Sequence, residues 1–199
     1  MTKIKICGMM SPQDAEFLNA VQPDYAGMIL SPGFRRTVPR ENAAAIRRTL
    51  DSRIPAVGVF VDAEPAEIAV FLQDGIIQIV QLHGHEDAAY IAALRQYTDA
   101  PVWQAFRIRN AEDVQRAEQS MADFVLLDSG TGSGKVFDWS LLSGIRRPFF
   151  LAGGLNPENA AEAVGTLHPY AVDVSSGVET DGRKDPQKMR AFIEAVRRV

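Results

Sequence analysis

Eight short apolar runs, most of them rich in β-branched residues, alternate with segments of helical periodicity along the whole 199-residue chain. We expect the apolar runs to form strands at residues 3–7, 25–30, 56–61, 77–82, 102–108, 124–128, 149–152 and 171–175. Strict alternation of strands and helices indicates a parallel sheet, because parallel neighbours need a crossover connection. Eight such units predict an α/β fold, a single-domain (β/α)8 barrel (TIM barrel) of eight parallel strands over residues 1–199.

An open, doubly wound sheet is the structural alternative. Such sheets usually have fewer strands, and the glycine fingerprint of dinucleotide binding does not follow the first predicted strand. Helix starts are indicated by Ser11 before Pro12, by Asn110 after the fifth strand, and by a helical segment from Glu86. No linker, low-complexity tract or charge block divides the chain, which favours one domain.

Charge and cysteine content exclude several classes of protein. The formal net charge of −4 leaves no overall positive field for nucleic acid or an anionic membrane, although it allows a local cationic pocket. Cys7 is the only cysteine, which argues against an extracellular disulfide scaffold. The N-terminus enters a strand directly, and no apolar stretch approaches the roughly 18 residues that span a bilayer. We therefore expect a cytoplasmic protein that binds neither nucleic acid nor membrane.

The barrel prediction sorts residues by position. In this fold, side chains at the carboxyl ends of the strands, and in the loops just after them, surround one shared site. Polar and small residues gather at those positions: Cys7, Arg35, Arg36, Gln81, His83, Arg107, Asp128, Gly153, Gly154, Asp173, Ser175, Ser176 and Gly177.

Two loops of small residues predict a phosphate site. Gly153 and Gly154 follow the seventh strand, and Ser175, Ser176 and Gly177 close the eighth. Small residues let a ligand approach backbone N–H groups, and barrels commonly bind phosphate after strands 7 and 8. Either loop alone is explained by a tight turn, but their joint position favours a phosphate ligand.

The segment at residues 130–135 superficially resembles a nucleotide-binding P-loop. Its spacing fails, because Ser129 and Val136 stand where the motif needs glycine and then Ser or Thr. We interpret it as a mobile loop after the sixth strand that can cover the ligand.

Cys7 and Asp128 are the candidates for acid–base chemistry. Each also has a structural explanation, since unpaired cysteines are often buried hydrophobes and aspartates after strands often hold loops. Facing each other across a barrel mouth, a thiol and a carboxyl can instead serve as base and acid, provided that partial burial raises the pKa of the carboxyl.

Histidines and arginines offer further binding groups. His83 and His85 have the spacing to share a metal, but His168 is the only other histidine, so we predict no metal site. We expect His83 to hydrogen-bond a substrate and His85 to face solvent. Arg36, after the second strand, is either solvated or holds a carboxylate with its planar fork. No strand-end serine forms a nucleophile elbow.

Together these segments resemble the phosphoribosylanthranilate isomerase family. The matching segments follow the family's order: KICG at 5–8, VFV at 59–61, QLHG at 81–84, LLD at 126–128, GK at 134–135 with FDW at 137–139, AGGLNPEN at 152–159 and VDVSSGVE at 172–179. As a set they are far more specific than any single motif.

The resemblance implies a (β/α)8 barrel without metal or organic cofactor. It implies an Amadori rearrangement in tryptophan biosynthesis, from N-(5-phosphoribosyl)anthranilate to 1-(2-carboxyphenylamino)-1-deoxyribulose 5-phosphate. It also implies that Cys7 is the general base, Asp128 the general acid, and Arg36 the partner of the anthranilate carboxylate. The other implied substrate contacts are Gly153, Gly154, Ser175, Ser176 and Gly177 for the phosphate, with His83 and Asp173 at the same mouth. Monomers and homodimers both occur in the family.

Some alternatives stay open at this point. Arg35 is a second candidate for the carboxylate, because Phe34 occupies a position where relatives often have a small polar residue. A related or dual-substrate isomerase of histidine biosynthesis is the second activity, although such barrels typically use paired aspartates rather than a residue like Cys7. A non-catalytic phosphate-binding barrel is the third hypothesis, and it would need neither Cys7 nor Asp128.

Overall fold

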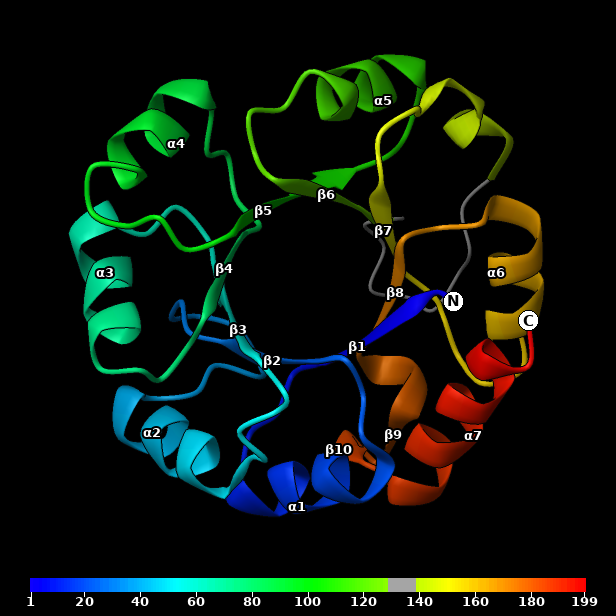
Figure 1. Cartoon of the computed structure of the whole chain (residues 1–199), viewed down its shortest axis with the longest axis horizontal. Helices are drawn as coiled ribbons and strands as arrows, with labels where there is room; N and C mark the ends of the chain where they lie inside the picture. Colours follow the sequence, from blue (N-terminus) through cyan, green and yellow to red (C-terminus); the bar gives the residue numbers. More distant parts are fainter. Residues whose placement is uncertain (129–138) are drawn as a thin grey trace.

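The computed structural model describes residues 1–128 and 139–199, and within these ranges eight strands form a closed parallel barrel (Figure 1). The strands follow one another around the ring in sequence order, and the last pairs with the first. They are β1 (Lys3–Cys7), β2 (Tyr25–Ile29), β3 (Ala56–Phe60), β4 (Ile79–Leu82), β5 (Val102–Arg107), β6 (Phe124–Asp128), β7 (Phe149–Ala152) and β8 (Ala171–Val174). The predicted (β/α)8 barrel is confirmed.

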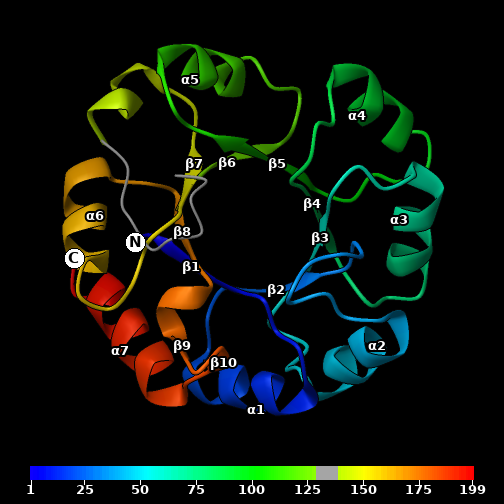
Figure 2. The same ribbon diagram turned by 180° about the vertical axis from the view of Figure 1, so that it is seen from behind.

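Helices surround the ring of strands on the outside (Figures 1 and 2). They are α1 (Pro12–Val21), α2 (Arg40–Thr49), α3 (Pro65–Gln73), α4 (Ala88–Leu94), α5 (Ala111–Glu118), α6 (Ala160–Leu167) and α7 (Pro186–Arg197). Between β6 and β7, the described residues contain the 3-10 helix η1 (Trp139–Gly144) in place of an α-helix. The expected loop at residues 130–135 lies outside the described residues.

Side-chain caps explain where the helices begin. Ser11 accepts a hydrogen bond from the N–H of Asp14, so the predicted cap is confirmed; the Asp14 carboxylate also accepts from the N–H groups of Met10 and Ser11, which completes a capping box. Asn110 caps α5 by accepting from the N–H of Asp113. Such caps satisfy backbone donors that have no partner inside the helix.

The fourth helix begins two residues later than Glu86, where it was predicted to begin. Asp87 caps it through the N–H of Tyr90, so the first helical residue is Ala88. Glu86 itself is buried, and its carboxylate accepts from the N–H groups of Asp62 and Gly84. Its role is therefore to join the turns after β3 and β4 rather than to start a helix.

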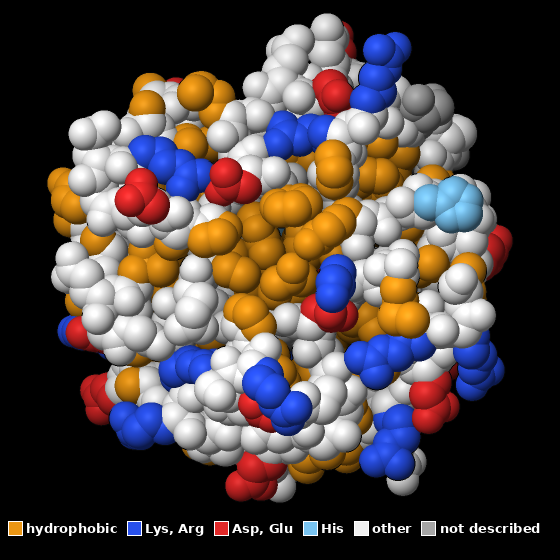
Figure 3. Space-filling model, in the orientation of Figure 1, with side chains coloured by type: hydrophobic (Ala, Val, Ile, Leu, Met, Phe, Trp, Pro, Cys, Tyr) orange, Lys and Arg blue, Asp and Glu red, His pale blue; other side chains and the backbone are white. Residues whose placement is uncertain are grey.

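The core has two parts, one outside and one inside the ring of strands. Period-two alternation along β1 shows the division: Ile4 and Ile6 belong to the outer cluster beneath the helices, so Lys5 and Cys7 face the interior. The inner cluster consists of Val57, Ile79, Trp103, Leu126, Phe150, Ala152 and Ala171. Figure 3 shows apolar side chains closing the centre of the ring, so the barrel is packed and not a pore.

Aromatic rings fill the end of the barrel where the strands begin. The ring centroids of Trp103 and Phe150 lie 4.3 Å apart, and those of Tyr25 and Trp103 lie 5.0 Å apart with their planes nearly perpendicular. Phe124 and Tyr170 continue the cluster. This packing leaves the carboxyl ends of the strands as the place for a cavity.

A short hairpin near the C-terminus was not predicted. The 3-10 helix η2 (Ser176–Val178) leads into β9 (Glu179–Thr180), which pairs antiparallel with β10 (Arg183–Lys184). Asp181 and Gly182 make the turn, both at positive φ. In Figures 1 and 2 the hairpin lies between α1 and α7.

No helix in the two described ranges is long and apolar enough to cross a membrane.

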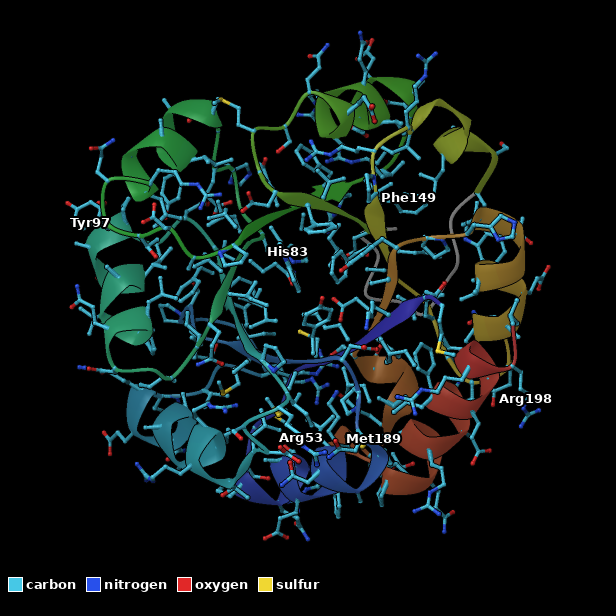
Figure 4. All side chains as sticks on the ribbon, viewed as in Figure 1. Arg53, His83, Tyr97, Phe149, Met189 and Arg198 are labelled. Atoms are coloured by element: carbon cyan, nitrogen blue, oxygen red, sulfur yellow. The ribbon has the colours of Figure 1, made fainter. Side chains whose placement is uncertain are left out.

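Substituting Phe150→Ala should lower the free energy of unfolding by about 3–5 kcal/mol, because it empties a fully buried aromatic position in the inner cluster. Tyr97→Ala is the control, since Tyr97 lies exposed on the rim (Figure 4) and its loss should change stability by about 0.5 kcal/mol or less. Urea denaturation of both variants measures this. Equal stability of the two variants would contradict the packed-interior interpretation.

Candidate active site

A cavity of about 230 Å³ opens among the carboxyl ends of the strands. It is lined by Cys7, Ile29, Arg36, Val59, Gln81, His83, Asp128, Ala152, Gly153, Gly154, Leu155, Asp173, Val174, Ser175 and Ser176. Every predicted site residue except Gly177 is in this set, although these residues come from six strands or the loops that follow them. Neither Arg35 nor Arg107, which the sequence also placed at strand ends, lines the cavity.

Cys7 ends β1 with its thiol buried at the cavity wall. Burial raises the pKa of Cys7 because an apolar surrounding disfavours the thiolate, while the positive charge of Lys5 lowers it. The balance leaves the pKa above its ordinary value. A thiol in this position is a weak nucleophile at neutral pH but a competent proton acceptor once its thiolate is stabilised.

Asp128 and His83 meet within the same cavity. His83 Nε2 lies 3.5 Å from Asp128 Oδ2, and Gln81 Nε2 lies 3.2 Å from His83 Nδ1. The two ring nitrogens of His83 therefore face Gln81 on one side and Asp128 on the other. In Figure 4, His83 points into the middle of the ring. Gln81 thus sets the orientation of His83.

The other histidine of the pair has a different environment. His85 is exposed and its Nδ1 lies 3.0 Å from Asp62 Oδ2, so its contacts are away from the cavity, as predicted. Within residues 1–128 and 139–199, no group of three or more potential ligands is arranged to hold a metal ion.

Arg36 reaches the cavity from the loop after β2, and the side chain of Glu179 holds it there. Arg36 Nε donates to Glu179 Oε1 at 2.7 Å, and Arg36 Nη2 donates to Oε2 at 3.0 Å. In the described part of the chain, Nη1 of Arg36 makes no further hydrogen bond. The paired contact therefore fixes the plane of the guanidinium and leaves its Nη1 edge for a ligand.

Arg35 also binds Glu179, but from the outer side. Its Nη2 donates to Glu179 Oε2 at 2.8 Å and its Nη1 donates to the carbonyl oxygen of Gly182 at 3.1 Å. The Arg35 side chain is largely exposed. Of the two arginines that the sequence left as candidates for a carboxylate, the geometry favours Arg36.

Glu179 is the centre of a cationic cluster that sequence reasoning missed. Besides the two arginines, the fully buried Lys184 donates to Glu179 Oε1 at 3.0 Å and to the carbonyl oxygen of Ser175 at 2.9 Å. Burial opposes ionisation of Glu179, but Arg36, Lys184 and Arg35 together lower its pKa to about 2. The Asp181-Gly182 turn is a hairpin signal that could have paired Glu179 with Lys184.

Lys5 and Asp173 form a second ion pair that sequence reasoning missed. Lys5 Nζ lies 2.8 Å from Asp173 Oδ2, with the lysine fully buried. The alternation of β1 places Lys5 on the same face as Cys7, which is the signal that could have revealed it. Two buried oxygens, Asp173 Oδ1 and Gln81 Oε1, have no hydrogen-bond partner among the described residues.

The loops after β7 and β8 contact each other and need glycine at several positions. Gly153 and Gly154 both have positive φ, which only glycine adopts readily. A Cβ on Gly177 would lie 1.9 Å from the carbonyl oxygen of Leu155, so the two loops touch through a residue that must be glycine. Gly177 therefore supports the cavity wall without lining it.

Comparison with known proteins is consistent along the whole chain. The family model for N-(5'-phosphoribosyl)anthranilate (PRA) isomerase matches residues 4–195. The PRA isomerase of Endomicrobium trichonymphae is 45% identical over 99% of both chains. The chain belongs to the PRA isomerase family.

Solved structures agree with this family. Monomers of the dimeric PRA isomerase from Thermotoga maritima match with a TM-score of 0.88 and 36% identity, covering 100% of both chains. A PRA isomerase solved in complex with reduced 1-(o-carboxyphenylamino)-1-deoxyribulose 5-phosphate matches with a TM-score of 0.87 and 33% identity, again over 100% of both chains. The family predicted from the motifs is confirmed.

Glu179→Gln should destabilise the protein by a pH-dependent amount, of the order of 3 kcal/mol at neutral pH, because it leaves buried cations unpaired. Since the pKa of Glu179 is about 2 in the folded protein and 4.5 ordinarily, its contribution is complete above pH 4.5 and is lost as the pH falls toward 2. Urea denaturation at several pH values should show that the difference in the free energy of unfolding between wild type and Glu179→Gln becomes smaller as the pH falls. Glu194→Gln is the control, because Glu194 belongs to an exposed ion pair on a helix. A difference in unfolding free energy for Glu179→Gln that does not change with pH would contradict the prediction.

Proposed function

We propose that this cavity carries out the PRA isomerase reaction with Cys7 as general base and Asp128 as general acid. The observation that carries the proposal is the meeting of this thiol and this carboxyl in one cavity, in a chain that matches the family over residues 4–195. The reaction opens the ribose ring of N-(5'-phosphoribosyl)anthranilate and moves a proton, which requires an acid and a base but no redox partner.

The two groups act in sequence on neighbouring atoms of the sugar. Asp128 protonates the ring oxygen as the bond to the anomeric carbon breaks, which leaves an iminium between that carbon and the anthranilate nitrogen. The iminium acidifies the proton on the adjacent carbon, and the Cys7 thiolate removes it. The resulting enolamine tautomerises to the ketone of 1-(2-carboxyphenylamino)-1-deoxyribulose 5-phosphate. Cys7 acts by proton transfer throughout and forms no covalent bond with the sugar.

Arg36 is the proposed partner of the anthranilate carboxylate. Its guanidinium is held in a fixed plane by Glu179 and borders the cavity. A pre-oriented arginine loses little side-chain freedom on binding, which favours a planar anion.

The loops after β7 and β8 are the proposed phosphate site, with Gly153, Gly154, Ser175 and Ser176 at the cavity and Gly177 between the loops. His83 and Asp173 are proposed to bind the sugar portion between the two anionic ends. The unpartnered Oδ1 of Asp173 supports this, because a buried acceptor is stabilised by a hydroxyl donor from a ligand.

The remaining expectations concern the protein as a whole. We propose that residues 1–199 work as one barrel domain, as a monomer or homodimer in the cytoplasm, without a metal or organic cofactor. The PRA isomerase of Thermotoga maritima is dimeric, which supports the homodimer as one of the two states.

Cys7→Ala should lower kcat by about 10²-fold or more while leaving the fold and product binding nearly unchanged, because it removes only the base. Asp128→Asn should cause a loss of similar size. Fluorescence assays with freshly prepared PRA measure both, with product binding as the control for an intact site. Full activity of Cys7→Ala would refute its role as base, and wild type acting on the histidine-pathway substrate but not on PRA would refute the proposed activity.

Arg36→Met should weaken binding of a reduced product analogue by about 10- to 100-fold, the value of a charge-assisted hydrogen bond of about 1.5–3 kcal/mol. An analogue lacking the benzoate carboxyl should bind wild type and Arg36→Met equally. Arg35→Met is the matched control, since Arg35 shares Glu179 but does not line the cavity. Calorimetric titration of the three proteins with the two analogues tests this; an equal loss for both analogues in Arg36→Met would show that Arg36 does not contact the carboxylate.

A further inference from the structure

Lys5 is a fully buried lysine for which the proposed acid–base steps have no use. It lies on β1 directly opposite Asp173 of β8 in the strand register, and its ammonium is 2.8 Å from Asp173 Oδ2. Both side chains face the barrel interior, where most neighbouring positions are apolar. A charged pair in such a place calls for an explanation.

A contribution to stability does not explain the buried pair of Lys5 and Asp173. Removing two charges from water is costly, and buried pairs can often be replaced by apolar side chains with no loss of stability. The inner cluster around Trp103 and Phe150 shows that this barrel packs apolar residues inside elsewhere. Moreover, Asp173 Oδ1 has no partner among the described residues, so the pair is not completely satisfied by its own surroundings.

The position of Lys5 relative to Cys7 supplies a functional explanation. The two residues are separated by one position on β1, so their side chains lie on the same face, with Cys7 nearer the cavity. The carboxylate that holds Lys5 belongs to Asp173, which lines the same cavity as Cys7. The Lys5 ammonium therefore lies where it can stabilise a negative charge on the sulfur from below, while substrate approaches from the cavity above.

We propose that Lys5 is a positioning residue whose buried positive charge stabilises the Cys7 thiolate, with Asp173 as the counter-ion that keeps Lys5 charged. The proposal rests on the proposed function only in taking Cys7 to be the base. The direction of each influence fits: Asp173 raises the pKa of Lys5, and Lys5 lowers that of Cys7 against the effect of burial.

Other charged groups also face Cys7 and must be kept in view. Asp173 on β8 raises the pKa of Cys7, and Lys184 on β10 lowers it less than Lys5 does. Lys184 is already engaged by Glu179 and the Ser175 carbonyl. Arg36, His83 and Asp128 line the same cavity from the loop after β2, from the turn after β4 and from β6. Lys5 is thus the cation with the largest effect on the thiol.

The test measures thiolate formation directly. Because Cys7 is the only cysteine, the rise of ultraviolet thiolate absorbance with pH, after subtraction of a Cys7→Ser blank, reports this residue alone. In Lys5→Met the pKa of Cys7 should rise by about one to three pH units, the effect of removing an opposite charge at close range. The thiolate-dependent limb of the kcat/KM profile should move to higher pH by the same amount.

Two further variants make the result decisive. Lys5→Met/Asp173→Asn removes both charges and avoids an unpaired carboxylate; its Cys7 pKa should rise by less than in Lys5→Met. Lys3→Met is the matched control on the same strand, because Lys3 lies exposed at the start of β1, farther from Cys7, and pairs with Asp24; it should leave the titration unchanged.

Circular dichroism identifies the folded variants before they are titrated. A wild-type Cys7 titration in folded Lys5→Met, or in the double variant when Lys5→Met does not fold, would overturn the proposal. If the Cys7 pKa rises in Lys5→Met but the wild type does not act on PRA, the role of Lys5 is supported and the proposed function is refuted. The two failures are therefore distinguishable.

Discussion

The ladder between β1 and β8 is the constraint on which the rest of the structure depends. It joins residues 168 positions apart in the chain and places Lys5 opposite Asp173. Closure also directs the carboxyl ends of the strands to one rim, so that a thiol from β1, a carboxyl from β6 and small residues after β7 and β8 line one cavity. An open sheet would leave β1 and β8 as separate edges, and their interior charges would lack partners.

Much of this arrangement could be predicted because parallel strands buried on both faces appear in a sequence as continuous apolar runs. Three strands were placed with the bounds that the structure has, and the others differ by one or two residues at an end. The position of Glu86 was mistaken for a helix start because its contact with the N–H group of Asp62 depends on a turn more than twenty residues away. Local periodicity carries no information of that kind.

The residues of the candidate site could be predicted from the sequence, but the contacts between them could not. Cys7, Asp128 and the two proposed phosphate loops were found from their positions at strand ends. Lys5 was missed because it lies two residues before the end of its strand. The contact of Arg36 with Glu179 spans 143 positions and depends on a short hairpin that was not predicted.

Net charge alone would describe this protein poorly. The chain is acidic overall, at −4, yet Arg35, Arg36 and Lys184 converge on the single carboxylate of Glu179 beside the cavity. Three cations on one anion leave a local positive excess next to the proposed binding sites for a carboxylate and a phosphate. Local arrangement, more than composition, therefore sets the electrostatic potential beside the cavity.

The hairpin formed by β9 and β10 has one more consequence. Glu179 holds Arg36, while Lys184 links Glu179 to the carbonyl of Ser175 in the proposed phosphate loop. Arg36 and the Ser175 loop, which are proposed to bind the two negatively charged ends of the ligand, are thus both held by this hairpin. The hairpin therefore couples the position of the Arg36 guanidinium to that of the loop after β8, so a change in its length or sequence would alter both.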